Sequence, residues 1–188
     1  MDREPDIVYR LNDEDEIVYV NEGWAEFALS NDASDLLPER VLNRPLWEFV
    51  SDDTTVHLYR QILQLARDGR PARFNFRCDS PECRRLMEMT VSGLDGSGVQ
   101  FETRVLREEE RPRKELLDRY GPRASKMLRI CGWCKRMNLD GESWGEIEEA
   151  VTSLRLFEYR ALPMLTHGMC ETCFQDIAGK LADWRSRS

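Results

Sequence analysis

The 188-residue sequence has no long hydrophobic run, and its apolar stretches span only a few residues. A membrane-spanning helix needs about 20 mostly apolar residues, so the sequence predicts none. The N-terminal segment, Met-Asp-Arg-Glu-Pro-Asp, also lacks the apolar core of a secretion signal. We therefore expect a cytoplasmic protein. In that compartment the six cysteines are more typical of metal ligands or free thiols than of a disulfide framework.

The sequence also has no excess of positively charged residues. Lys and Arg total 27 against 35 Asp and Glu, so the net charge is −8. Broad affinity for nucleic acids requires phosphate neutralisation, which this charge disfavours, although a local basic patch remains compatible with it. Kinase, cyclase and phosphodiesterase motifs, internal repeats and low-complexity segments are also missing. These absences favour a globular protein without enzymatic activity.

Residues 6–106 alternate between strand and helix patterns. Short strands are predicted at 7–11 and 17–20, followed by a helix capped by Asn21. A longer amphipathic helix is predicted from Thr54 to about Asp68, after a cap signal at Ser51 and Asp52, and Gly69 is expected to end it. Alternating segments at 72–78, 86–91 and 99–106 predict three further strands.

The composition changes after Leu106. Residues 107–124 are rich in charge and contain Pro112 and Gly121-Pro122, which predicts a linker with a short helix near 114–120. Residues 125–188 are predicted to form a second domain. It would contain a helix at about 143–159 and a last helix with Ile177, Leu181 and Trp184 on one face.

Five metal-ligand side chains lie in this second domain: Cys131, Cys134, His167, Cys170 and Cys173. Two C-x-x-C pairs with this spacing are typical of a tetrahedral zinc site. We favour the four cysteines as ligands, with His167 in place of one cysteine as the alternative. Buried thiols or a disulfide are the simpler interpretation. Four thiolates would leave no position for water or substrate, so the zinc would be structural.

Two other interpretations of these motifs are weaker. Cys-Gly-Trp-Cys-Lys is also compatible with a redox dithiol or a haem attachment site, but the surrounding sequence supports neither. A zinc deaminase requires H-x-E, and here Met169 follows His167-Gly168. Its proton-transferring glutamate is therefore missing. The order of a cysteine knuckle followed by a cysteine pair at a helix N-terminus is similar to a treble-clef zinc finger.

The order of elements in residues 6–106 resembles a PAS domain. Ile17-Val18-Tyr19-Val20-Asn21-Glu22-Gly23-Trp24 looks like the second strand of that family entering its first helix, and Leu46-Trp47-Glu48-Phe49-Val50 resembles the segment before its long helix. The segment from Ile130 to Cys170 looks like a cysteine-rich tail that follows sensory domains in bacterial signalling proteins. The resemblance implies an α+β fold: a five-stranded antiparallel sheet with flanking helices, plus a small zinc-stabilised, treble-clef-like module.

This resemblance further implies a homodimer whose N-terminal domain senses a small ligand or a redox state and signals to a protein partner. A photoactive flavin is disfavoured because its cysteine motif is missing. A haem would take its axial ligand from the long helix, where His57 is a weak candidate. Cys78 and Cys83 flank a turn and are a candidate redox pair, with nearby arginines that would favour thiolates.

We therefore expect a regulatory protein. A zinc-dependent nucleic-acid-binding transcriptional regulator is the alternative, for which Lys126, Arg129, Lys135, Arg136, Arg155 and Arg160 supply positive charge. A zinc enzyme would need an open coordination position. The two-domain interpretation predicts that Cys131→Ser loses zinc and unfolds the second domain while sparing the first.

Overall fold

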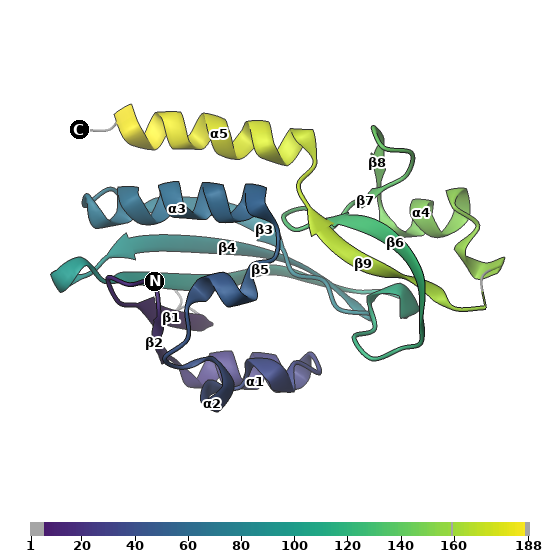
Figure 1. Ribbon diagram of the computed structural model, residues 1–188, viewed down its shortest axis with the longest axis horizontal. Helices are drawn as coiled ribbons and strands as arrows, with labels where there is room; N and C mark the ends of the chain where they lie inside the picture. The colour runs from purple at the N-terminus through teal and green to yellow at the C-terminus, as the bar shows by residue number, and fades with distance from the viewer. Residues whose placement is uncertain (1–5, 159, 187–188) are drawn as a thin grey trace.

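The computed structural model describes residues 6–158 and 160–186 and has an α+β fold with two sheets (Figure 1). The first sheet is antiparallel, and its strand order is β2-β1-β5-β4-β3. Its strands are β1 (Ile7–Leu11), β2 (Ile17–Val20), β3 (Ala72–Arg77), β4 (Cys83–Gly93) and β5 (Val99–Glu110). The predicted α+β class and the five antiparallel strands are confirmed.

Helices fill the chain between β2 and β3: α1 (Glu22–Ser30), α2 (Pro38–Val41) and α3 (Asp53–Arg67), with 3-10 turns η1 (Ser34–Leu36) and η2 (Leu46–Phe49). The Asn21 side chain accepts a hydrogen bond from the Trp24 N–H (3.0 Å), and Asp52 accepts one from the Thr55 N–H (2.8 Å). Both satisfy backbone donors that a helix start leaves unpaired. Both predicted N-caps are confirmed.

One face of the first sheet is apolar and packs against α3. Met87, Met89 and Val91 alternate along β4 and are buried. The α3 helix turns Leu58, Ile62 and other apolar residues inward. Gly93 permits the close approach, since a Cβ there would lie 2.3 Å from the Ala66 carbonyl oxygen.

Aromatic side chains fill the space between this sheet and its helices. Tyr9 of β1 stacks on Phe101 of β5 with ring centroids 4.4 Å apart, and Trp24 of α1 meets Tyr9 edge-on at 5.3 Å. Tyr59 of α3 lies 6.2 Å from Phe101 and 6.4 Å from Phe74. Such pairs contribute about 0.5–1.5 kcal/mol each beyond the burial of their area.

The second sheet has the order β8-β7-β6-β9, and its strands β6 and β9 run parallel. Its strands are β6 (Arg123–Cys131), β7 (Met137–Asn138), β8 (Trp144–Gly145) and β9 (Leu162–Gly168), accompanied by α4 (Ile147–Ser153), η5 (Leu156–Glu158) and α5 (Glu171–Ser186). A separate small core packs under this sheet, formed by Leu116, Leu128, Ile130, Met137, Ile147, Ala150 and Leu156.

The helix predicted at 143–159 is shorter than expected. Trp144 and Gly145 pair with β7 as strand β8, so helical backbone begins only at Ile147. Position 159 lies outside the described residues. The tertiary pairing of β8 with β7 therefore overrides the local helical pattern.

The segment predicted as a linker is tied to the first sheet. Residues 107–110 belong to β5, where Glu110 is opposite Cys83 in β4. Beyond them, the Arg111 N–H donates to the Glu82 carbonyl and the Lys114 N–H to the Pro81 carbonyl, both at 2.9 Å. The short helix expected near 114–120 is the 3-10 turn η4 (Glu115–Leu117). The connection therefore follows the β3–β4 hairpin closely.

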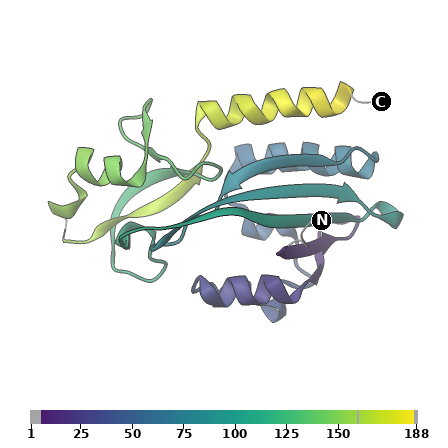
Figure 2. The same ribbon diagram turned by 180° about the vertical axis from the view of Figure 1, so that it is seen from behind.

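The last helix lies against the first sheet's long helix rather than against the second sheet alone. Figures 1 and 2 both show α5 running beside α3. Ile177, Leu181 and Trp184 are buried in the same cluster as Phe74 and the other apolar residues of the first sheet. Hydrophobic residues from both predicted domains thus form one core. Among the described residues, no helix has the length and apolar character that membrane crossing requires.

An ion-pair network also joins the two parts. Arg77 at the end of β3 bonds to Asp79 and, through its Nη1, to Glu146 just before α4 (2.8 Å). The Asp79 side chain is fully buried and also lies 3.3 Å from Arg111 Nη1. Burial lowers the pKa of Arg77, but its hydrogen bonds to Asp79 and Glu146 outweigh this and raise it. Arg84 extends the network, because it pairs with Glu148 at 2.7 Å.

Replacing Glu146 with glutamine is expected to weaken this connection. The change removes the negative charge that pairs with Arg77 but keeps an acceptor oxygen, and Arg77 retains Asp79 as its second partner. Because Glu146 is 35% exposed, we expect a loss of only about 1 kcal/mol in the free energy of unfolding, measured by urea titration. Glu142→Gln, at an exposed turn nearby, is the matched control. Equal stability of the two variants would contradict this role of the network.

Candidate metal centre

Four cysteine side chains meet where β6 and β9 end and α5 begins. The sulfur atoms of Cys131, Cys134, Cys170 and Cys173 all lie within 4.8 Å of one another. The Cys134 and Cys170 sulfurs are 3.7 Å apart. Four sulfurs at about 2.3 Å from a tetrahedral zinc ion would be separated by about 3.8 Å, so this arrangement fits such an ion. The four cysteines can therefore hold a metal ion.

The first pair lies in a tight turn after β6. The Cys131 N–H donates to the Arg136 carbonyl (2.8 Å), and the Lys135 N–H donates back to the Cys131 carbonyl (3.0 Å). Lys135 closes the turn with a φ of 60°, in the left-handed region. Its ammonium group donates to the Gly132 carbonyl at 3.0 Å. These bonds hold the two sulfurs on one side of the turn.

The second pair lies at the start of the last helix. The Cys170 carbonyl accepts from the Phe174 N–H (3.0 Å), which is the first helical bond of α5, and Cys173 lies in the first turn. The Cys170 N–H points at the Cys131 sulfur (3.4 Å). Backbone donors and the positive end of a helix both favour thiolates at this position.

The cysteines of this cluster shift one another's pKa values, and a bound cation would change that balance. Hydrogen bonds from the thiols of Cys134 and Cys173 lower the pKa of Cys131 well below its usual range. The same contacts raise the pKa of Cys134 and of Cys173. A thiolate at Cys131 thus disfavours further thiolates at Cys134 and Cys173. A divalent cation would replace those protons and allow four thiolates to coexist.

His167 is outside this group of converging ligands. It lies in β9 opposite Ile130, and its side chain is exposed. Within residues 6–158 and 160–186, the group of ligand atoms that lie close enough together to share a metal ion consists of the four cysteine sulfurs and does not include His167. The geometry therefore favours the four-cysteine set over the alternative that includes His167.

The residue inside the first cysteine pair connects the centre to the first sheet. Trp133 is 5% exposed and packs against Phe74 of β3 at 4.8 Å and Tyr59 of α3 at 6.0 Å. Its carbonyl accepts a hydrogen bond from the Arg77 N–H at 2.7 Å. Sequence reasoning missed this contact. The sequence does contain a signal for it: an indole lies between the two cysteines of the first pair, where a solvent-exposed turn would favour a polar residue.

The predicted redox cysteines are both free thiols in the β3–β4 hairpin. They are not opposite one another, because Cys78 bonds to the Arg85 carbonyl while Cys83 pairs with Ser80. Burial raises the pKa of Cys78 and outweighs the cations near it. Arg85 does act toward a thiolate at Cys78, as expected, but the effect of burial on the pKa is larger.

The candidate haem ligand His57 lies in α3, as predicted, but its side chain is exposed. It lines a surface hollow between α3 and α5 together with Arg60, Gln61 and Arg185. Leu58 and Ile62 occupy the helix face that meets the sheet. The geometry therefore gives no support to His57 as a ligand within the core.

No protein-family model matches this chain, and no curated protein matches it either. Its functional interpretation therefore depends on the geometry of the cysteine centre and on the fold that carries it.

Proposed function

We propose that this chain is a non-enzymatic regulatory protein in which a PAS-type sensory lobe, residues 6–106, is connected to a zinc-stabilised module. The observation that carries the proposal is Trp133. It lies between two cysteines of the centre and is packed in the core of the first sheet. A change in that core would therefore reach the metal centre through direct contact, and the reverse also holds.

A structural zinc ion is the metal that this donor set favours. Four thiolates in a tetrahedral arrangement are typical of structural zinc sites, and they leave no coordination position for water or substrate. The turn after β6 and the N-terminus of α5 supply two sulfurs each, which supports the proposal of a treble-clef-like module. The closed donor set argues against the zinc-enzyme interpretation.

The sensory assignment is supported by the order of elements. The chain runs through two strands, short helices, a longer helix and three strands. The five strands form one antiparallel sheet, and its apolar face packs on the helices. This is the order on which the PAS resemblance is based. Tyr9, Phe74 and Phe101 occupy the interior, so a large cofactor such as haem would have to displace them. A small ligand or a redox change is the more compatible input.

We further propose that the protein is a cytoplasmic homodimer and that it signals by associating with another protein. It is supported by the absence of catalytic motifs for signalling enzymes in the sequence. Native mass spectrometry and an absorption spectrum of the purified protein would report the number of chains, the metal and any coloured cofactor. A haem absorption band would contradict the proposed type of input.

The zinc assignment predicts one zinc ion per chain, measured by elemental analysis of protein purified without added metal. Because the metal would tie the turn after β6 to the start of α5 through all four sulfurs, we expect the chelated protein to lose stability. Protein that contains no stoichiometric metal, or that contains iron in place of zinc, would contradict the assignment.

Nucleic-acid binding by the module is the less supported alternative. Several of its basic side chains are already paired: Arg136 lies 3.5 Å from Glu146, and Arg155 lies 2.6 Å from Glu158. Salt-dependent binding of duplex DNA by the full chain would favour this alternative. An absence of binding at low salt would remove it.

A further inference from the structure

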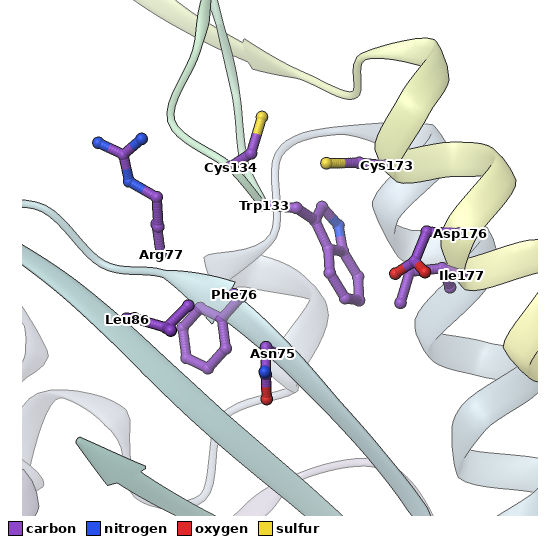
Figure 3. A pocket seen from close by; sticks show the side chains of 9 residues that line it. All are labelled: Asn75, Phe76, Arg77, Leu86, Trp133, Cys134, Cys173, Asp176 and Ile177. Carbon is purple, nitrogen blue, oxygen red and sulfur yellow. The ribbon is translucent and has the colours of Figure 1, made fainter. Parts of the chain in front are cut away.

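A small cavity opens beside the cysteine centre, at the edge of the first sheet (Figure 3). Its volume is about 170 Å³. Its lining is largely apolar and includes Phe76, Leu86, Trp133 and Ile177, with Cys134 and Cys173 at one end. Asn75 and Leu86 are exposed, so the cavity reaches the surface at β3 and β4.

The four cysteines differ in their access to this cavity. Cys131 and Cys170 are 0% and 3% exposed, and neither lines it. Cys134 and Cys173 are half-buried and lie next to each other at the cavity wall (Figure 3). A molecule in the cavity would therefore meet one sulfur from each pair.

We propose that Cys134 and Cys173 form an oxidation site for a small peroxide that enters through this cavity. This inference rests on the proposed zinc centre and specifies its regulation. The small volume suits an uncharged oxidant of the size of hydrogen peroxide, and the lining also includes Asn75, Arg77 and Asp176, which supply polar groups for hydrogen bonds to it. Susceptibility of cysteine to oxidation follows thiolate character and access, and zinc ligands are thiolates.

The chemistry needs only the peroxide and the two cysteines. Zinc would keep both sulfurs deprotonated; the thiolate of Cys134 or Cys173 then attacks a peroxide oxygen, which breaks the O–O bond and yields a sulfenic acid and hydroxide. The other thiolate attacks the sulfenic sulfur, forms the Cys134–Cys173 disulfide and expels a second hydroxide. Two protons convert the hydroxides to water. The peroxide gains the two electrons that the sulfurs lose.

Oxidation would release the metal and loosen the last helix. A zinc ion left with only Cys131 and Cys170 has lost half of its ligands, and these two sulfurs then take up protons. The two sulfurs that oxidise belong to the turn that carries Trp133 and to the first turn of α5. Their movement from within 4.8 Å to the 2.05 Å of a disulfide would shift both elements where they pack on the first sheet.

The test uses the full chain with Cys78→Ser and Cys83→Ser, so that only the four centre cysteines remain. Hydrogen peroxide is added to the zinc-loaded protein, zinc release is followed with a chromogenic chelator, and the acid-quenched product is mapped by peptide mass spectrometry. We expect one zinc ion released per disulfide formed, and a Cys134–Cys173 linkage. A linkage within Cys131–Cys134 or Cys170–Cys173 would overturn the inference.

A pair of surface variants tests the route. Asn75→Trp should cover the cavity mouth and slow zinc release about five-fold or more, because access controls thiol oxidation. Arg73→Trp, two residues earlier on β3 and outside the cavity lining, should leave the rate unchanged. Equal rates in both variants would overturn the inference. Protein that never binds zinc would instead contradict the proposed function, so the two failures are distinguishable.

Discussion

Cys131→Ser is expected to abolish zinc binding and to destabilise both parts of the protein. Cys131 is fully buried and its sulfur accepts a hydrogen bond from the Cys170 N–H, so a shorter hydroxyl there removes a metal ligand and disturbs this buried contact. Structural zinc sites contribute about 10 kcal/mol or more to the folding of small metal-binding domains. Loss of the metal should therefore unfold the turn after β6 and the start of α5.

The shared core extends this effect to the first sheet. Trp133 and the α5 residues Ile177, Leu181 and Trp184 cover Phe74 and Tyr59, which belong to β3 and α3. When they leave, these apolar surfaces become exposed to water. The sequence-based expectation that the first domain is spared therefore needs revision, since the two predicted domains share one hydrophobic core.

Hydrogen exchange of the full chain would measure this. We expect faster exchange in β3 and α3 of Cys131→Ser, beside a zinc content near zero. Cys83→Ser, at the half-buried hairpin position away from the centre, should retain both zinc and protection. Unchanged protection of β3 and α3 in Cys131→Ser would show that the first sheet is stable by itself, as the sequence alone predicts.

Local patterns predicted most of the first sheet. The caps at Asn21 and Asp52 form short-range hydrogen bonds, and the strand alternation reports one buried face, so both are visible within a few residues. The cysteine pairs are likewise recognisable because each C-x-x-C spans a single turn. Their spacing favoured the four-cysteine grouping but left His167 as an alternative ligand, which only the geometry disfavours.

Contacts between residues far apart in the sequence could not be predicted from such local patterns. The parallel pairing of β6 with β9 joins residues about 40 positions apart, and neither strand alternates strongly enough to reveal it. Residues 107–110 looked like a linker because their charges suit solvent, yet they extend a strand whose partners, Arg84 and Arg85, are basic. Both features depend on which residues of distant strands pair with each other, and a single sequence does not show that pairing.

Trp133→Ala is expected to separate the docking of the module from metal binding. The indole is nearly fully buried but supplies no ligand, so zinc content should remain at one ion per chain. Removing it leaves a cavity against Phe74 and Tyr59, and large-to-small changes of this kind cost about 3–5 kcal/mol. Urea unfolding would measure the loss, and hydrogen exchange should rise along α5, whose Trp184 also contacts Phe74.

Phe157→Ala provides the matched control, because this aromatic side chain is 70% exposed and should change stability by less than about 0.5 kcal/mol. If Trp133→Ala retains zinc and loses stability, the metal holds the module together while the indole attaches it to the first sheet. If the variant loses zinc as well, the centre depends on docking for its own geometry. Signals would then pass from the core to the metal as readily as in the opposite direction.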